Sequence, residues 1–153
     1  MARSIPNFVW RWMKALNRRM TANFGAKTPE FVLVLTTTGR KSGQPRQTPL
    51  QFEEVEGNYL VASARGAQAD WYRNLLAHPN VTVQVKGRSF EGTAEPVTDP
   101  AKIADFFQLR LQRRPRMMRL MLRAEGLPAN FTRAQLEQFA AEKAVVVIRP
   151  GTT

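Results

Sequence analysis

The stretch FVLVLTTTGRKSGQPRQTPLQFE, residues 31–53, decides how the first part of this chain folds. It begins with a short apolar run at 31–35, whose β-branched and aromatic content favours a buried strand over a helix. Residues 47–53 predict a second strand. The polar segment between the two runs is therefore expected to be a loop that joins two strands of one sheet.

This loop combines glycines with cations. Gly39 and Gly43 allow positive φ and a close approach of backbone N–H groups to an anion, while Arg40, Lys41 and Arg46 supply positive charge. Two interpretations carry similar weight here, a cradle for a phosphate group and a charged hairpin turn exposed to solvent. A Walker A loop is excluded, because no Gly-Lys-Ser/Thr triplet ends the segment and no helical pattern follows it.

The rest of the chain predicts four further strands. They are expected at 58–63, 81–85, 89–97 and 144–148, from alternating or continuous apolar residues between turn signals. Together with the first two they make an α+β fold, a mostly antiparallel sheet of about six strands with helices outside it. At this strand count we expect the sheet to close into a small barrel.

Helices are predicted between the strands. A short helix capped by Asp70 should end before Pro79, and a longer one should begin at Asp99. Pro115 should interrupt the longer helix, and a capping box should start a last helix at Thr132.

Composition narrows the function classes. With 153 residues and 43% hydrophobic content, one domain over 1–153 with a real core is expected. The chain has no cysteine and one histidine, His78, which makes metal sites and Ser-His-Asp catalysis poor candidates. No run is long enough to span a bilayer, and no signal peptide is evident, so we expect a cytoplasmic protein.

The formal net charge of +11 predicts an anionic partner: a phosphorylated cofactor, a membrane surface or nucleic acid. The basic residues gather in the loop, in an amphipathic helix predicted over 1–25, and between Arg110 and Arg123. The helix over 1–25 either packs on the domain or makes a peripheral membrane contact. A stripe of methionines over 117–121 suits either helix core or a wall over an apolar ligand.

Four ordered segments, 35–50, 61–63, 71–75 and 78–85, resemble the deazaflavin (F420)-dependent nitroreductase family. The resemblance covers roughly residues 31–95 of the chain. It implies a split β-barrel of the FMN-binding type and the 8-hydroxy-5-deazaflavin coenzyme F420. It also implies an oxidoreductase that passes hydride from the reduced coenzyme to a quinone, a nitro compound or another conjugated acceptor.

The resemblance also assigns residues. The loop would hold the phosphate and the acidic oligoglutamate tail of the coenzyme, residues 48–50 would line the path to the ring, and 62–64 would contact the ring edge through backbone groups. The implied cofactor-binding residues are Gly39, Arg40, Lys41, Ser42, Gly43, Arg46, Thr48, Pro49, Leu50, Ala62, Ser63, Ala64, Arg65, Trp71 and Asn74. Ser63 would in addition orient an acceptor oxygen, unless backbone groups satisfy its hydroxyl. No metal is implied.

The chain departs from the family near its C-terminus, where tyrosines that close over the acceptor are replaced by Phe131 or Phe139. From the methionine stripe and the basic amphipathic helix we expect an apolar, conjugated small-molecule acceptor such as a quinone. Binding of FMN or a tetrapyrrole on the same barrel stays open as an alternative. A barrel that binds nucleic acid is disfavoured, because the aromatics fall on helices and in apolar runs. A homodimer through the first helix or a barrel edge is also left open.

Overall fold

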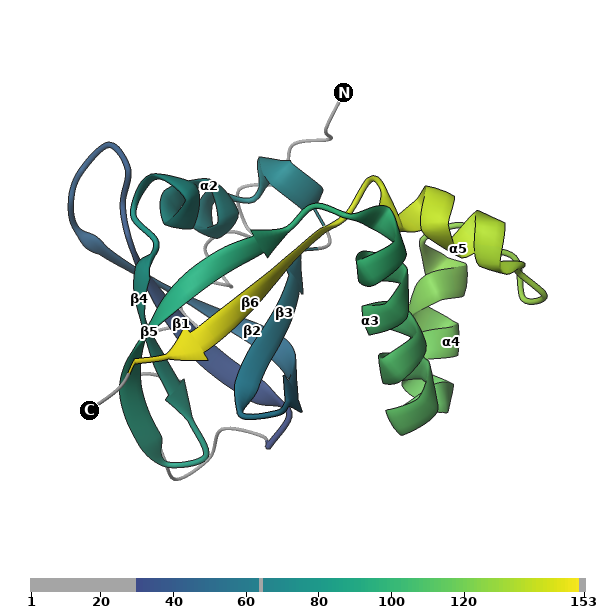
Figure 1. Cartoon of the computed structure of the whole chain (residues 1–153), viewed down its shortest axis with the longest axis horizontal. Coiled ribbons are helices and arrows are strands. Elements are labelled where there is room, and N and C mark those ends of the chain that lie inside the picture. The colour runs from purple at the N-terminus through teal and green to yellow at the C-terminus, as the bar shows by residue number, and fades with distance from the viewer. Residues whose placement is uncertain (1–29, 64, 152–153) are drawn as a thin grey trace.

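The computed structural model describes residues 30–63 and 65–151, and within them six strands form a closed antiparallel barrel in the order β1-β2-β3-β6-β5-β4 (Figure 1). The strands are β1 (Val32–Thr38), β2 (Pro45–Val55), β3 (Asn58–Ser63), β4 (Asn80–Val85), β5 (Arg88–Val97) and β6 (Ala144–Pro150). All six neighbouring pairs are antiparallel. The predicted fold class is confirmed, and the helix predicted over 1–25 lies outside the described residues.

The barrel interior is filled by alternate apolar side chains of every strand. Leu33, Val61, Val83 and Ile148 are fully buried there. One end of the barrel is covered by η1 (Gly66–Gln68) and α2 (Asp70–Ala77). Burial of this interior supplies the main favourable term in folding, so the barrel is the rigid support on which any site is built.

Asp70 does not cap α2. Ala69 occupies the N-cap position without a side-chain hydrogen bond, and Asp70 is the first residue of the helix. Its carboxylate instead contacts Arg40 at 3.2 Å. The prediction of Asp70 as the cap was wrong, because a distant arginine captures the side chain and the residue lies one position inside the helix.

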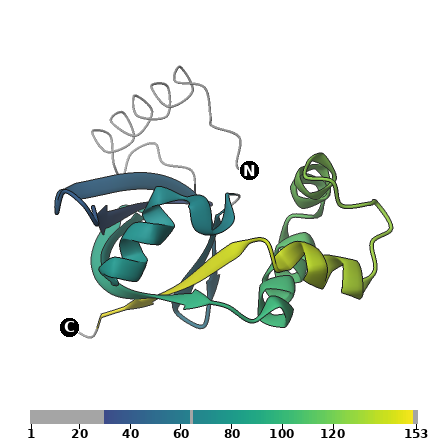
Figure 2. The same ribbon diagram turned by 90° about the horizontal axis from the view of Figure 1, so that it is seen from above.

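Three helices form a second layer beside the barrel (Figure 2). α3 (Pro100–Arg113), α4 (Pro115–Ala124) and α5 (Arg133–Ala140) lie in sequence between β5 and β6. The predicted cap at Asp99 and the capping box at Thr132 are both present. A second apolar core, which includes Phe106, Leu136 and Val145, joins these helices to the outer face of β6.

The methionine stripe of α4 divides between core and surface. Met118 and Leu122 are buried in the helical core, whereas Met121 is 37% exposed. Part of the stripe is therefore helix core, which was one of the two interpretations of the sequence. No helix among the described residues is long and apolar enough to cross a membrane.

Candidate functional site

The loop between β1 and β2 is closed by its own backbone. The N–H of Gly39 donates to the carbonyl of Gln44 at 2.8 Å, and the N–H of Gly43 donates to the carbonyl of Gly39 at 2.8 Å. Gly43 has a φ of 70°, a left-handed conformation that glycine adopts at little cost. A Cβ on Gly39 would lie 2.6 Å from Ser42 Oγ. Both glycines of the predicted cradle are thus needed for the shape of the loop.

Arg40 is anchored to α2 by three contacts. Its backbone N–H and its Nη1 donate to Asn74 Oδ1 at 3.1 and 2.8 Å, and its Nη2 contacts Asp70 Oδ1 at 3.2 Å. Asn74 is itself 4% exposed, and its Nδ2 donates to Thr37 Oγ1 at 3.4 Å. The chain therefore fixes the loop on α2 through a buried amide, which links the predicted residues Arg40 and Asn74 directly.

Lys41 and Arg46 complete the positive charge of the loop. Both side chains are exposed, and within residues 30–63 and 65–151 neither has an ion pair with a carboxylate. Ser42 Oγ accepts from the N–H of Gln44 at 3.2 Å, so this hydroxyl supports the loop. The loop offers two exposed cations to an anion while Arg40 is held in place beside them.

A gap in strand pairing begins close to this loop. β2 pairs with β1 over residues 45–51, whereas its ladder with β3 covers 52–55 and stops at Phe52 opposite Val61. Continuing that register would bring 51 and 50 opposite Ala62 and Ser63, but the ladder does not extend to them. We call this gap the seam. The predicted residues of β2 and β3 lie on its two sides, where backbone groups are free of this ladder.

The structure brings most predicted residues to the seam and the loop. Thr48, Pro49 and Leu50 are half-buried on β2, and Ser63 is 3% exposed at the end of β3. Ala62 is partly buried against the helical core.

Other predicted residues lie elsewhere. Ala64 lies outside the described residues, and Arg65 follows it at the start of η1. Trp71 packs in the barrel core and makes a T-shaped ring contact with Tyr72, so it supports α2 from inside. Phe139 packs against Phe107 in the helical core.

A second cluster of charges, which sequence analysis missed, lies at the other end of β2. Glu53, 3% exposed, accepts from Arg110 Nε and Arg113 Nη1, each at 3.2 Å, and lies 3.7 Å from Arg114 Nε. Burial lowers the pKa of Arg110 from its ordinary value, and the charge of Glu53 opposes that shift. The spacing of the three arginines, i, i+3 and i+4, was the signal that they share one helix face.

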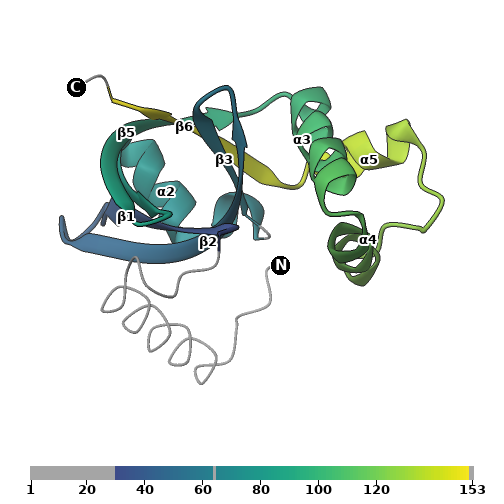
Figure 3. The same ribbon diagram turned by 90° about the horizontal axis from the view of Figure 1, so that it is seen from below.

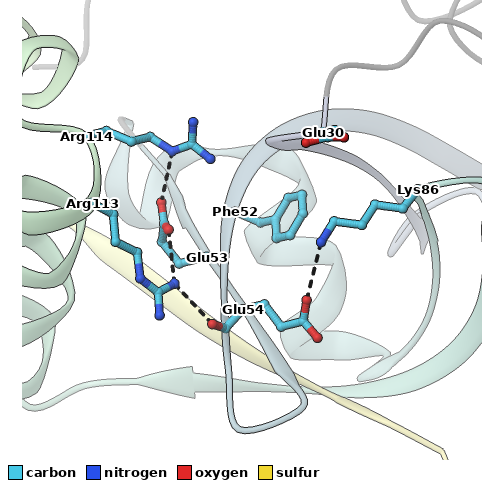
Figure 4. Close-up of a pocket in the computed structure, with 7 residues that line it drawn as sticks. All are labelled: Glu30, Phe52, Glu53, Glu54, Lys86, Arg113 and Arg114. Atoms are coloured by element: carbon cyan, nitrogen blue, oxygen red, sulfur yellow. Dashed lines mark hydrogen bonds and ion pairs between the residues drawn. The ribbon is translucent and has the colours of Figure 1, made fainter.

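A pocket of about 350 Å³ opens beside this cluster (Figure 4). Its walls include Phe52, Lys86 and Arg113, and Lys86 pairs with Glu54 at 3.6 Å. Because the arginines and the lysine that line it all face carboxylates, the pocket has balanced charge. It lies away from the loop that precedes β2. The pairs of Glu53 hold the C-terminal end of α3 on β2, and the Lys86–Glu54 pair joins the turn between β4 and β5 to β2.

Comparison with known proteins gives three findings. The family model described as F420H(2)-dependent quinone reductase matches residues 9–126. An F420H(2)-dependent quinone reductase of Mycobacterium tuberculosis is 40% identical over 68 residues, which are 42% of this chain and 46% of the relative. The match thus spans less than half of that relative's length.

The third finding is a likeness to solved structures, which at these identities shows the fold alone. One is described as an F420-H2 dependent reductase (FDR-A), with 24% identity, 78% of this chain and 94% of that chain covered, and a TM-score of 0.54. Another, described as a domain-swapped dimer, has 22% identity, covers 92% of this chain and 99% of its own, and has a TM-score of 0.57. Both support the barrel architecture.

Proposed function

The chain belongs to the F420H(2)-dependent quinone reductase family, and we propose that it transfers hydride from reduced coenzyme F420 to a quinone at the seam of its barrel. The family is F420H(2)-dependent, so coenzyme F420 is the cofactor and the FMN alternative is not needed. The observation that supports this site best is the loop at 39–46, where two exposed cations lie beside the seam.

The residues of the loop fit an anionic coenzyme. Lys41 and Arg46 would contact the phosphate and the acidic tail, and the arginine fork would grip phosphate oxygens. Arg40, fixed by Asn74, would add charge from a position that costs little entropy on binding. Thr48–Leu50 and Ser63 would then face the deazaflavin ring across the seam.

The proposed reaction needs no nucleophile or metal from the protein. The bound reduced deazaflavin supplies the hydride, and a quinone that accepts a hydride and a proton becomes a hydroquinone. The protein has to hold both partners and orient the acceptor oxygen, a role we assign to the hydroxyl of Ser63. The proton comes from solvent, so the lack of a histidine at the loop or the seam is consistent with the reaction.

The experiment that tests this site is a fluorescence titration with oxidised F420. The variant Lys41→Gln/Arg46→Gln should lose about tenfold in affinity, about 1.4 kcal/mol, because two exposed charge contacts are removed. A matched control, Lys102→Gln/Arg149→Gln, removes two charges at exposed positions of α3 and β6 and should bind as the wild type does.

A second ligand separates the loop from the ring site. The deazaflavin riboside, which has no phosphate or glutamate tail, should bind equally to the wild type and to the loop variant. If the loop variant lost as much affinity for the riboside as for F420, the two cations would contact the ring and not the phosphate or tail. If its F420 affinity were unchanged, the loop would not be part of the site.

Nitro compounds and other conjugated acceptors belong to the same proposal as alternatives to quinones. All three accept hydride at an electron-poor carbon or nitrogen, so the seam does not select among them by charge. Steady-state oxidation of reduced F420 with a water-soluble quinone, a nitroaromatic and an enone, compared by kcat/KM, would rank them. A quinone value below both of the others would overturn the choice of quinone.

A further inference from the structure

Six arginines between residues 110 and 123 divide into two groups with different surroundings. Arg110, Arg113 and Arg114 turn toward Glu53 and fasten the helical layer to β2. The other three, on α4, are exposed. They are Arg116, Arg119 and Arg123. The ion pairs with Glu53 explain the first group as part of the stability of the fold. They do not explain the three arginines of α4.

The arginines of α4 lack the partners that arginines have elsewhere in the described chain. Arg133 pairs with Asp105 and Glu137, and Arg149 pairs with Glu95. Within residues 30–63 and 65–151, by contrast, no carboxylate forms an ion pair with an arginine of α4. α4 itself carries no acidic residue. Its outer face is therefore positive without local compensation.

α4 also exposes two apolar side chains, of which Leu120 lies next to the arginines. Leu120 is 73% exposed and Met121 is 37% exposed, and both belong to the few large apolar side chains of the described residues that face water. The opposite side of α4 is anchored by the buried Met118 and Leu122. At about 100° per residue, Leu120 projects almost directly away from that anchored side, and Arg116 and Arg123 lie about 40° and 60° from it around the helix. A single exposed leucine would need no explanation, but a leucine set among unpaired arginines does.

We propose that the outer face of α4 docks on the surface of an anionic lipid bilayer. A helix that lies in a membrane interface combines arginines, which pair with lipid phosphates, with apolar side chains that enter the acyl boundary. α4 has both on one face, and the arginine stems can lie along the bilayer while their heads stay in the headgroup layer. Figure 3 shows α4 at the edge of the helical layer, apart from the barrel strands, and its arginines and Leu120 are exposed.

The choice of a bilayer also rests on the proposed function. A quinone with an apolar tail is held in the membrane, and an enzyme docked there meets its acceptor at high local concentration. The seam and the loop belong to the barrel strands and α4 belongs to the helical layer, so the two proposed contacts use different elements.

The test is co-sedimentation of the full chain with vesicles, one set of phosphatidylcholine and one with phosphatidylglycerol added. We expect binding to the anionic vesicles only, and a loss of about 100-fold for Arg116→Gln/Arg119→Gln/Arg123→Gln. Leu120→Asn should lose about tenfold and fold normally, because the side chain is already in water. The charge-matched control Arg73→Gln/Lys102→Gln/Arg149→Gln should lose less than fivefold.

Several results would overturn the proposal. An equal loss for the control triple would show that net charge alone acts, and unchanged binding of both α4 variants would place the contact elsewhere. Tighter binding to an oligonucleotide, sensitive to the arginines but not to Leu120, would assign α4 to nucleic acid. Vesicle binding needs neither coenzyme nor quinone, and turnover of a water-soluble quinone needs no vesicle, so the two proposals fail separately.

Discussion

The charge cluster around Glu53 should dominate the response of this fold to a single neutral substitution. Glu53→Gln keeps the shape of the side chain but removes the charge that faces Arg110, which is 5% exposed. Breaking a buried ion pair in this way costs about 3 to 5 kcal/mol, because the remaining charge is left uncompensated. Arg110 keeps Gln51 Oε1 at 2.6 Å, and the other two arginines reach solvent. We therefore expect about 3 kcal/mol.

The measurement is urea unfolding followed by circular dichroism. For a domain of this size, a loss of about 3 kcal/mol also lowers Tm by about 10 °C. The neighbouring variant Glu54→Gln is a matched control: its pair with Lys86 is 40% and 46% exposed, so it should cost less than about 0.5 kcal/mol. If the two variants cost the same, the reasoning from burial fails. The double variant Glu53→Leu/Arg110→Met should recover most of the loss, because an apolar pair needs no desolvated charge.

Other predictions concern the loop. Asn74→Ala removes the buried acceptor of two Arg40 donors and should cost about 1 to 2 kcal/mol in urea together with part of the F420 affinity. Asp70→Asn breaks only a solvent-exposed pair, so stability should stay within about 0.5 kcal/mol while F420 binding tightens, and a weaker titration curve would contradict this. Gly39→Ala would place a Cβ 2.6 Å from Ser42 Oγ and 3.2 Å from the Gln44 carbonyl, and should lower stability by about 1 to 3 kcal/mol in the same urea assay. Gly39→Ala/Ser42→Ala should recover only part of that loss, because the backbone contact remains.

Sequence patterns predicted correctly those strands and helix caps that are set by residues close to one another in the chain. The strand at 58–63 and the capping box at Thr132 were predicted correctly, because alternation and capping act within a few residues. The prediction that Asp70 caps α2 was wrong because a residue far away in the sequence decides where its side chain lies. Its carboxylate is drawn to Arg40, 30 residues away, and local propensity does not register that contact.

The seam and the Glu53 cluster could not have been predicted from local pattern. The seam exists because β2 pairs with β1 over residues 45–51 but pairs with β3 only from residue 52 onward. This is a property of three strands together. Glu53 meets Arg110 across 57 positions of sequence. The loop was located correctly because its glycines and cations are contiguous, but the anchoring of Arg40 by Asn74 required the fold.

The net charge of +11 is therefore not the signature of one partner. Part of it is balanced inside the molecule, where Glu53 pairs with two arginines of α3 and with Arg114, which follows α3. Lys41 and Arg46 concentrate charge on a loop fixed by backbone bonds, as suits a small anion with defined geometry. The arginines of α4 lie on a helix face beside an exposed leucine, as suits an extended anionic surface with an apolar interior. Geometry, and not total charge, separates these roles, so variants matched in charge but placed on different elements are the comparison that distinguishes them.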